Sequence, residues 1–358
     1  MTKHAGIFAA AAFLIIPFIM MGRDVHQAHA YGLILMVIIG LALYLPNPFL
    51  SAFGLYAAGW MAFVFSLFFV GQSNSTLVMV TIDAMLFIIM GMLAYLAVYH
   101  SEVTTDGWAN IICTLALIQA IIGICQHYWF DPVSTVLNYV VDVRGEYSFL
   151  TPIGTLGNKN FLGALLAMSL PFFFRVSHWV LAVPIIIFGL FVVSTSTAAV
   201  AACVGVGYFF AGWRGSAVMI VPAILYVLFW DQQSFSGHGG ERFLFWQDGL
   251  TKVFSSWKTA VFGYGPGITW KIGNQLHNEY VMTVWNYGLI GLALMGAFIM
   301  SLSRESRMLF TAFVILCVNM LGNHPLHTIP TALLAVVIIA LLEREASDYG
   351  VKQYPFRA

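Results

Sequence analysis

Long apolar runs separated by short polar segments dominate the chain. Since about 20 helical residues cross the hydrocarbon core of a bilayer, these runs predict membrane-spanning helices. We expect about twelve of them, over residues 5–21, 30–45, 49–70, 77–99, 109–128, 160–175, 178–194, 198–212, 216–230, 280–301, 308–321 and 326–342. Several runs are short, which favours helices packed in a bundle. The pattern predicts an all-α, polytopic integral membrane protein with a single membrane domain over 1–358.

The composition agrees with this fold class and excludes an ordinary soluble domain. Hydrophobic residues make up 60% of the chain and charged residues only 8%, against roughly 45–50% and 25% in soluble proteins. The 15 basic and 15 acidic residues cancel, so no basic field favours a nucleic acid as partner. Four cysteines lie inside apolar runs and are predicted to be small buried hydrophobes: Cys113, Cys125, Cys203 and Cys317.

The distribution of cations predicts the topology. If both termini are cytoplasmic, the short inner connections hold Arg175, Arg214, Arg304 and Arg307. The short outer loops, 71–76, 194–197 and 322–327, contain neither Lys nor Arg. This asymmetry is what the positive-inside rule predicts. Three outer places do carry cations, which therefore need another explanation: the first loop with Arg23, and the longer segments 129–159 and 231–279.

The N-terminal segment admits a second interpretation. Lys3, the apolar run 5–21 and the triplet Ala28-His29-Ala30 also fit a cleaved signal peptide. Either interpretation leaves the topology of the following spans unchanged.

The outer segment 231–279 contains an amphipathic pattern. Spacings of three and four residues relate Phe243, Trp246, Leu250, Val253 and Trp257, which predicts a helix lying at the membrane interface. Arg242 lies four residues before Trp246, so the two share a helix face. A guanidinium held there could bind a phosphate with two hydrogen bonds. The alternative is an arginine that only reaches toward lipid headgroups.

His277 lies at the start of a predicted hydrophobic helix, with Asn278 as its cap and Glu279 in the first turn. The partial positive charge of a helix N-terminus favours a neutral imidazole, and free N–H groups there would form an anion site. A histidine without a chemical role remains the alternative. Upstream, Tyr264 belongs to the glycine-rich segment 263–267, which predicts a tight turn or a close backbone approach to a ligand.

A second outer segment offers Arg144, Lys159 and Asn160 after a pair of glycines. Residues of these types at a helix start fit either simple capping or an anion site. His324 belongs to an H-x-x-H sequence, but no third zinc ligand lies nearby in the sequence. We therefore predict that His324 faces the same region as His277 and does not bind zinc. Asp83 within a predicted span is a functional candidate or a structural pair.

No D-x-D or H-E-x-x-H sequence occurs in an outer loop. We therefore predict no metal site and no cofactor. The negative charge that develops in chemistry on a pyrophosphate would then have to be neutralised by cationic side chains. Arg242, Arg144 and Lys159 are placed for this role.

These residues resemble the O-antigen ligase and polymerase superfamily of bacterial envelope proteins. The resemblance covers about residues 144–292. Its elements are Arg242-x-x-x-Trp246, Gly263-x-Gly265-x-Gly267, His277-Asn278-Glu279-Tyr280, Gly288-x-x-Gly291 and Gly154-x-x-Gly157-Asn158-x-Asn160. About twelve spans, with the largest periplasmic loop between helices 9 and 10, also resemble the ligase branch.

The resemblance implies a multi-pass glycosyltransferase of the bacterial inner membrane. Such an enzyme takes a glycan from undecaprenyl pyrophosphate on the periplasmic side, without a metal, and the ligase branch transfers it to the lipid A core. Arg242 would bind the pyrophosphate, His277 would orient or deprotonate the acceptor hydroxyl, and Arg144 would be a second phosphate ligand. We expect further contacts to the donor, the acceptor or membrane lipids from Lys159, Asn160, Trp246, Tyr264, Asn278 and His324.

Two departures from the family leave alternatives open. Residues 194–198 contain no cation, whereas family members often carry an arginine after a serine there, and the chain is short for the family. A polymerase, which uses a second lipid-linked glycan as acceptor, and a protein-directed transferase remain possible. A transporter or flippase of lipid-linked glycans is a more distant alternative. A metal-dependent transferase using Asp24 is another.

Overall fold

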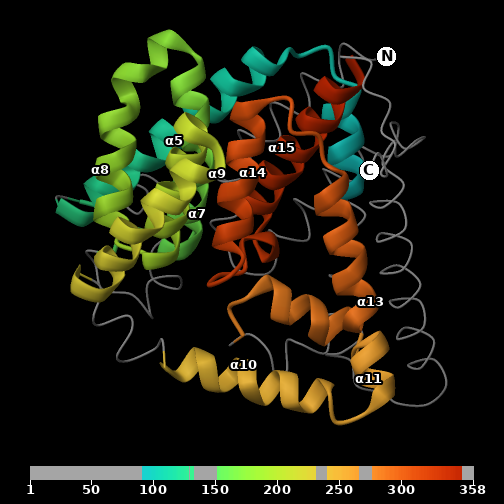
Figure 1. Cartoon of the computed structure of the whole chain (residues 1–358). Coiled ribbons are helices and arrows are strands. Elements are labelled where there is room, and N and C mark those ends of the chain that lie inside the picture. Colours follow the sequence, from blue (N-terminus) through green and yellow to red (C-terminus); the bar gives the residue numbers. More distant parts are fainter. Residues whose placement is uncertain (1–90, 129, 133–150, 231–239, 266–275, 349–358) are drawn as a thin grey trace.

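The computed structural model describes residues 91–128, 130–132, 151–230, 240–265 and 276–348. Within these ranges the protein is helical and contains no strand (Figure 1). By length and composition, three described helical segments are long and apolar enough to cross a membrane: α5 (Thr105–Tyr128), the segment Ser196–Leu225 of α9, and α13 (Glu279–Ser301). The second reverses at Ala211–Gly212 and the third bends at Gly288. The first three predicted spans, most of the fourth, Asp83 and Arg144 lie outside the described residues.

The central helix of the bundle is α7 (Lys159–Arg175), which packs against α5, α8, α9, α14 and α15. Every residue from Leu162 to Phe173 is buried, as expected for a helix that is apolar on all sides. Helix α14 (Arg307–Asn319) is also mostly buried. Burial on all faces fixes the axis of α7, and therefore the position of its first residues.

The described helices agree closely with the predicted runs. Five of the predicted runs begin and end within about four residues of the observed boundaries. They correspond to α5, α7, α13, α14, and η3 (Ser177–Ala182) together with α8 (Val183–Val193). Helix α15 (Ile329–Asp348) continues beyond the predicted end at 342. All four cysteines are free: Cys113 is buried and the other three are half-buried. The prediction of small hydrophobic cysteines is therefore consistent with their positions.

Helix α9 (Ser196–Trp230) contains two predicted runs, and the chain reverses between them. The backbone is non-helical at Ala211 and Gly212, where φ of Gly212 is +63°. A Cβ atom added to Gly207 would collide with the carbonyl of Gly215. Residues eight apart in a straight helix are about 12 Å apart, so this contact requires a helical hairpin.

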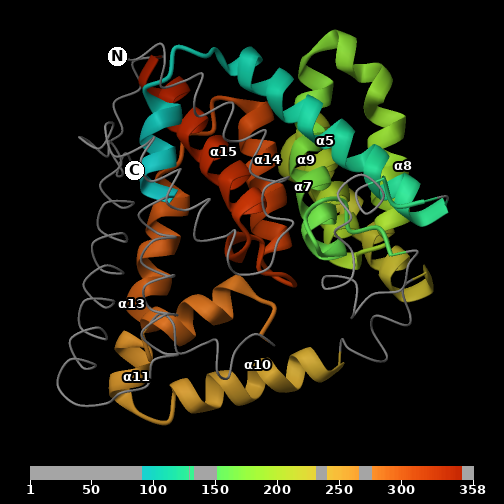
Figure 2. The same ribbon diagram turned by 180° about the vertical axis from the view of Figure 1, so that it is seen from behind.

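Helices α10 (Gly240–Val253) and α11 (Trp257–Phe262) lie at one end of the bundle, and α10 runs across it (Figures 1 and 2). Helix α13 bends at Gly288, where φ is +65°, so that its first part runs along α10 and its second part along the bundle. The bend frees carbonyl groups that α13 would otherwise use. Tyr264 N–H donates to Trp285 O at 2.8 Å, and Gly265 N–H donates to Asn286 O at 3.0 Å.

Glycine is required on both sides of this contact. A Cβ atom at Gly263, where φ is +79°, would lie 2.5 Å from Asn286 backbone atoms, and one at Gly288 would collide with the carbonyl of Val261. Of the two predicted uses of this glycine-rich segment, the structure shows a close backbone approach as far as Gly265. This approach is to α13.

The connections between helices gather at two opposite ends. At the end that we call the His277 end lie the loops before α7, between α8 and α9, before α13 and between α14 and α15, together with α10. At the other, the Arg175 end, side chains of Arg175, Arg307 and Arg344 contact neighbouring segments. The predicted inner connections and the predicted short outer loops that are described therefore lie apart.

Candidate functional site

The 320–324 loop, between α14 and η5 (Pro325–His327), brings the candidate residues together at the His277 end. Arg242 Nη1 of α10 donates to Gly322 O at 3.1 Å. The imidazole ring of His277 lies 4.7 Å from that of His324, between centroids. Asn323 Nδ2 donates to Asn160 O at 3.3 Å. Three of the predicted site residues, from distant parts of the sequence, therefore approach one loop, to which the fourth, His324, belongs.

Asn278 caps α13, as predicted. Its Oδ1 accepts from Tyr280 N–H and Val281 N–H, both at 3.0 Å, and its Nδ2 donates to Leu321 O at 2.8 Å. Glu279 N–H donates to Met320 O at 2.9 Å. The predicted anion site on free N–H groups of this helix is therefore wrong, because the N–H groups of its first turn already have partners.

Glu279 holds the far side of the same loop. Its side chain is buried, and Oε1 accepts from Leu326 N–H at 2.8 Å. Together with the bonds of Asn278, this attaches the segment 320–326 to the start of α13 at both of its ends. The position of His324 relative to His277 is thereby fixed by one backbone hydrogen bond and by two bonds between the side chains of Asn278 and Glu279 and the backbone of this segment.

His277 has a strained backbone and a neutral side chain. Its φ is +42°, in the left-handed region that non-glycine residues seldom adopt. Its Nδ1 is buried and has no hydrogen-bond partner among the described residues. Burial, and then the charge of Arg242, lower the pKa of His277 to about 4. The predicted neutral imidazole is confirmed, but burial and Arg242 cause it rather than a free helix end.

His324 faces His277 in a fixed orientation. Its N–H donates to Asn323 Oδ1 at 2.9 Å, and its ring meets Phe161 edge to face at 5.5 Å. Neither Phe161 nor Asn323 was among the residues predicted for the site. They are separated from the residues they contact by about 160 positions, and no local pattern announces such a contact.

Arg242 and Trp246 share the face of α10 that turns toward α13, as their spacing predicts. Both are half-buried, and Trp246 Nε1 donates to Leu276 O, next to His277. The predicted helix does not reach Trp257, because α10 ends at Val253 and a second helix begins after the capping residue Ser256. Phe243, predicted on the same apolar stripe, is 64% exposed.

The other predicted ligands have mixed positions. Tyr264 packs on Trp285, with ring centroids 4.7 Å apart, and its hydroxyl donates to Lys252 O at 2.9 Å, so it supports the connection of α10 to α13. Lys159 is the half-buried first residue of α7, directly before Asn160. Asn158 caps this helix by accepting from Asn160 N–H at 2.8 Å. The capping that we weighed against an anion site is therefore present.

Two buried glutamines of α5 fix the segment that leads into α7. Gln126 Oε1 accepts from Ile153 N–H at 2.9 Å and from Gly154 N–H at 2.7 Å. Gln119 Oε1 accepts from Thr155 N–H at 3.0 Å, and its Nε2 donates to Thr155 Oγ1 at 2.7 Å. The sequence analysis missed both glutamines. The available signal was two amides seven residues apart, on one face of an otherwise apolar run.

The turn between α8 and α9 supplies hydroxyl groups at this end. Thr197 is close to the 320–324 loop, since a Cβ atom at Gly322 would lie 2.8 Å from Thr197 Oγ1. Ser194 has a φ of +48°, and the buried Thr195 Oγ1 has no partner in the described part of the chain. In the same ranges, no group of three or more His, Cys, Asp or Glu residues could hold a metal ion.

The arrangement places a neutral hydrogen-bond acceptor beside a cation. The imidazole of His277 can accept a hydroxyl proton, and the nearby guanidinium of Arg242 can bind an anion. Without a metal, both properties favour transfer of a group from a phosphate leaving group to a hydroxyl. No protein-family model matches the chain, and no curated protein matches it significantly.

Proposed function

We propose that the protein is a membrane glycosyltransferase of the O-antigen ligase type. It would move a glycan from undecaprenyl pyrophosphate to a lipid A core acceptor on the periplasmic face of the bacterial inner membrane. The observation that carries the proposal is the neutral His277 held beside Arg242 at the 320–324 loop. The resemblance in sequence supplies the identity of the donor and the acceptor.

In the proposed reaction, the acceptor hydroxyl attacks the anomeric carbon of the donor glycan. The hydroxyl proton passes to His277, and the bond between the anomeric carbon and the pyrophosphate oxygen breaks with its electron pair on that oxygen. Arg242 stabilises the charge that develops there. Arg144, which lies outside the described residues, would be a second phosphate ligand.

The same site suits two related reactions. A polymerase would use a second lipid-linked glycan as acceptor, and a protein-directed transferase would use a side-chain hydroxyl. A transporter or flippase is favoured less, because the candidate residues gather at one end of the described bundle rather than at its middle, where such sites lie.

Reconstitution with a defined donor tests the proposal. The purified protein is placed in liposomes with an undecaprenyl-pyrophosphate-linked repeat unit, with and without lipid A core, and with a chelator throughout. Product that forms only with the core supports a ligase, whereas a ladder from the donor alone supports a polymerase. Absence of product in a protein that binds the donor contradicts both. A parallel reaction without chelator completes the test, because product that forms only in that reaction would point to a metal-dependent transferase.

A further inference from the structure

We propose that the site is activated by its own donor: a diphosphate anion bound at Arg242 converts His277 into the proton acceptor. The acceptor hydroxyl would then be activated only in a donor-loaded site. This inference rests on the proposed function for the identity of the donor. Its first step, the coupling of an anion to the imidazole, can be measured without any transfer reaction.

The geometry holds the two groups together before any substrate arrives. Arg242 is bonded to Gly322 O, and Asn278, which follows His277, is bonded to Leu321 O. The guanidinium and the side chain next to His277 are therefore bonded to adjacent carbonyl groups of one loop, and the imidazole itself lies 4.7 Å from the ring of His324, between centroids. The buried Nδ1 of His277 has no hydrogen-bond partner among the described residues, so no described group already uses this nitrogen.

The charges around His277 explain why an anion would change its state. Arg242 acts on it from α10 and His324 faces it from the 320–324 loop, while the carboxylate of Glu279, two residues along the chain, accepts from Leu326 N–H and Lys159 begins α7. Burial and Arg242 hold its pKa near 4, which leaves it a weak base at neutral pH. A diphosphate carries more negative charge than one guanidinium neutralises. Its binding therefore reverses the local electrostatic effect and raises the pKa of His277.

The proton balance of the step follows from this order of events. In the donor-loaded site, the acceptor O–H gives its proton to the imidazole while the new bond to the anomeric carbon forms. The pyrophosphate leaves with the electron pair of the broken bond. When the polyprenyl pyrophosphate departs, the pKa of His277 falls again, and the imidazolium releases its proton to water. Release of the polyprenyl pyrophosphate therefore returns His277 to its neutral, weakly basic state.

Titration of His277 by NMR tests the coupling in the full-length protein in nanodiscs. Histidines are labelled with ¹⁵N, and the signal of His277, one of 10 histidines, is assigned by its loss in His277→Asn. Inorganic pyrophosphate is the probe. We expect a pKa near 4 without the probe and above about 5 at saturation. By linkage, pyrophosphate then binds more tightly as the pH falls, by up to about tenfold per pH unit between the two pKa values.

Variants separate this coupling from titration of pyrophosphate itself. Calorimetry in buffers of different ionisation enthalpy should detect proton uptake on binding that is absent in His277→Asn. Arg242→Gln should raise the pKa of His277 without pyrophosphate and weaken binding of the probe. Lys252→Gln is the matched control, because this cation lies on the same helix but is paired with Asp248 at 2.6 Å. It should leave the pKa of His277 unchanged.

The outcomes that overturn the inference are distinct from those that overturn the proposed function. If pyrophosphate fails to bind, or binds while the pKa of His277 stays near 4, the inference is wrong. If the protein still transfers the glycan in that case, the proposed function is supported and only the inference is wrong. If pyrophosphate raises the pKa of His277 but the protein transfers no glycan to any acceptor, the coupling stands and the proposed function is wrong.

Discussion

The two ends of the bundle use polar residues differently. At the Arg175 end, cations contact groups that hold helix ends in place. At the His277 end, hydrogen bonds hold the loops, while an imidazole is kept neutral in a strained backbone next to a guanidinium. This difference is the one expected if, as proposed, the His277 end carries out the transfer and the Arg175 end only holds the helices together.

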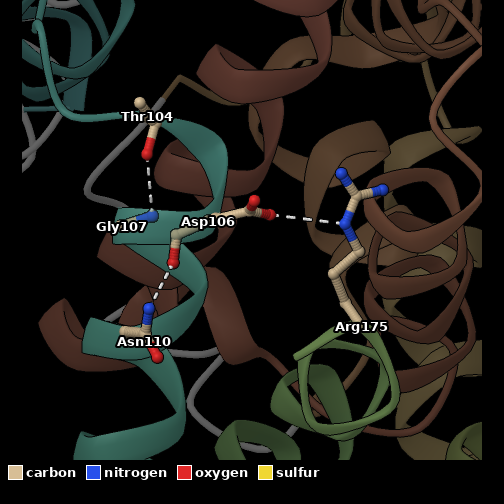
Figure 3. A network of polar contacts seen from close by, with 5 residues as sticks. All are labelled: Thr104, Asp106, Gly107, Asn110 and Arg175. Atoms are coloured by element: carbon tan, nitrogen blue, oxygen red, sulfur yellow. Dashed lines mark hydrogen bonds and ion pairs between the residues drawn. The ribbon is translucent and has the colours of Figure 1, made fainter. Parts of the chain in front are cut away.

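Figure 3 shows the pattern at the Arg175 end. Arg175 Nε of α7 donates to Asp106 Oδ1 of α5 at 3.3 Å. Gly107 N–H donates to Thr104 Oγ1, and Asn110 Nδ2 donates to Asp106 O, so the same few residues also build the first turn of α5. Each of these contacts joins or caps helices, and none places a neutral base beside a cation.

The largest expected effect is that of His277→Ala. Removing a positioned base lowers transfer by about 10²–10⁴-fold, while the donor still binds through Arg242. The matched control is His178→Ala, which changes an exposed histidine at the Arg175 end and should leave transfer unchanged. Rates of transfer and binding of donor are measured in liposomes. Equal losses in both variants would remove the distinction between the two ends.

Arg242→Gln should have the next largest effect. Loss of a charged hydrogen bond to the pyrophosphate is worth about 10–100-fold in kcat/KM. Arg175→Gln is the control at the other end, where the arginine is bonded to Asp106 instead. Steady-state kinetics with varied donor concentration measure both. If Arg175→Gln folds normally but loses all transfer activity, the phosphate site lies at the Arg175 end and the proposed site is wrong.

The sequence predicted the helices and the partners of local contacts, but not the contacts between distant loops. Apolar runs read directly as helices, and the Asn278 cap lies within three residues of the groups it binds. The 320–324 loop is different, because Arg242 and Asn160 meet it across 80 and 163 positions. No local sequence pattern specifies that Arg242 and Asn160 contact this loop. The free N–H groups expected at α13 were wrong for two reasons, because the predicted Asn278 cap already binds two of these groups and the distant Met320 O accepts from the third.

Gly288→Ala should have an intermediate effect on both stability and transfer. Alanine at this position would have to keep a positive φ, which is unfavourable for a residue with a side chain. Its Cβ atom would also collide with the carbonyl of Val261, and this collision would push α11 away from α13. Strain and overpacking of this kind cost about 1–3 kcal/mol, so thermal unfolding in detergent should occur at a lower temperature.

Gly296→Ala is the matched control on the same helix. Nothing lies within 4 Å of its added Cβ atom, and alanine favours a helix over glycine by about 1 kcal/mol. This variant should unfold at the same or a higher temperature. If Gly288→Ala is equally tolerated, the bend of α13 is not needed to hold His277 in place.

The smallest expected effect is that of Asp106→Asn. The change removes the ion pair with Arg175, but the two side chains are 64% and 51% exposed, so water screens the interaction and its contribution is about 0–1 kcal/mol. Asparagine keeps the length of the side chain, and the bond from Asn110 to the backbone carbonyl is unaffected. Thermal unfolding should shift little and transfer should not change. A loss of transfer in a stably folded Asp106→Asn protein would mean that the Arg175 end controls the His277 end, because no described polar contact of Asp106 reaches the 320–324 loop.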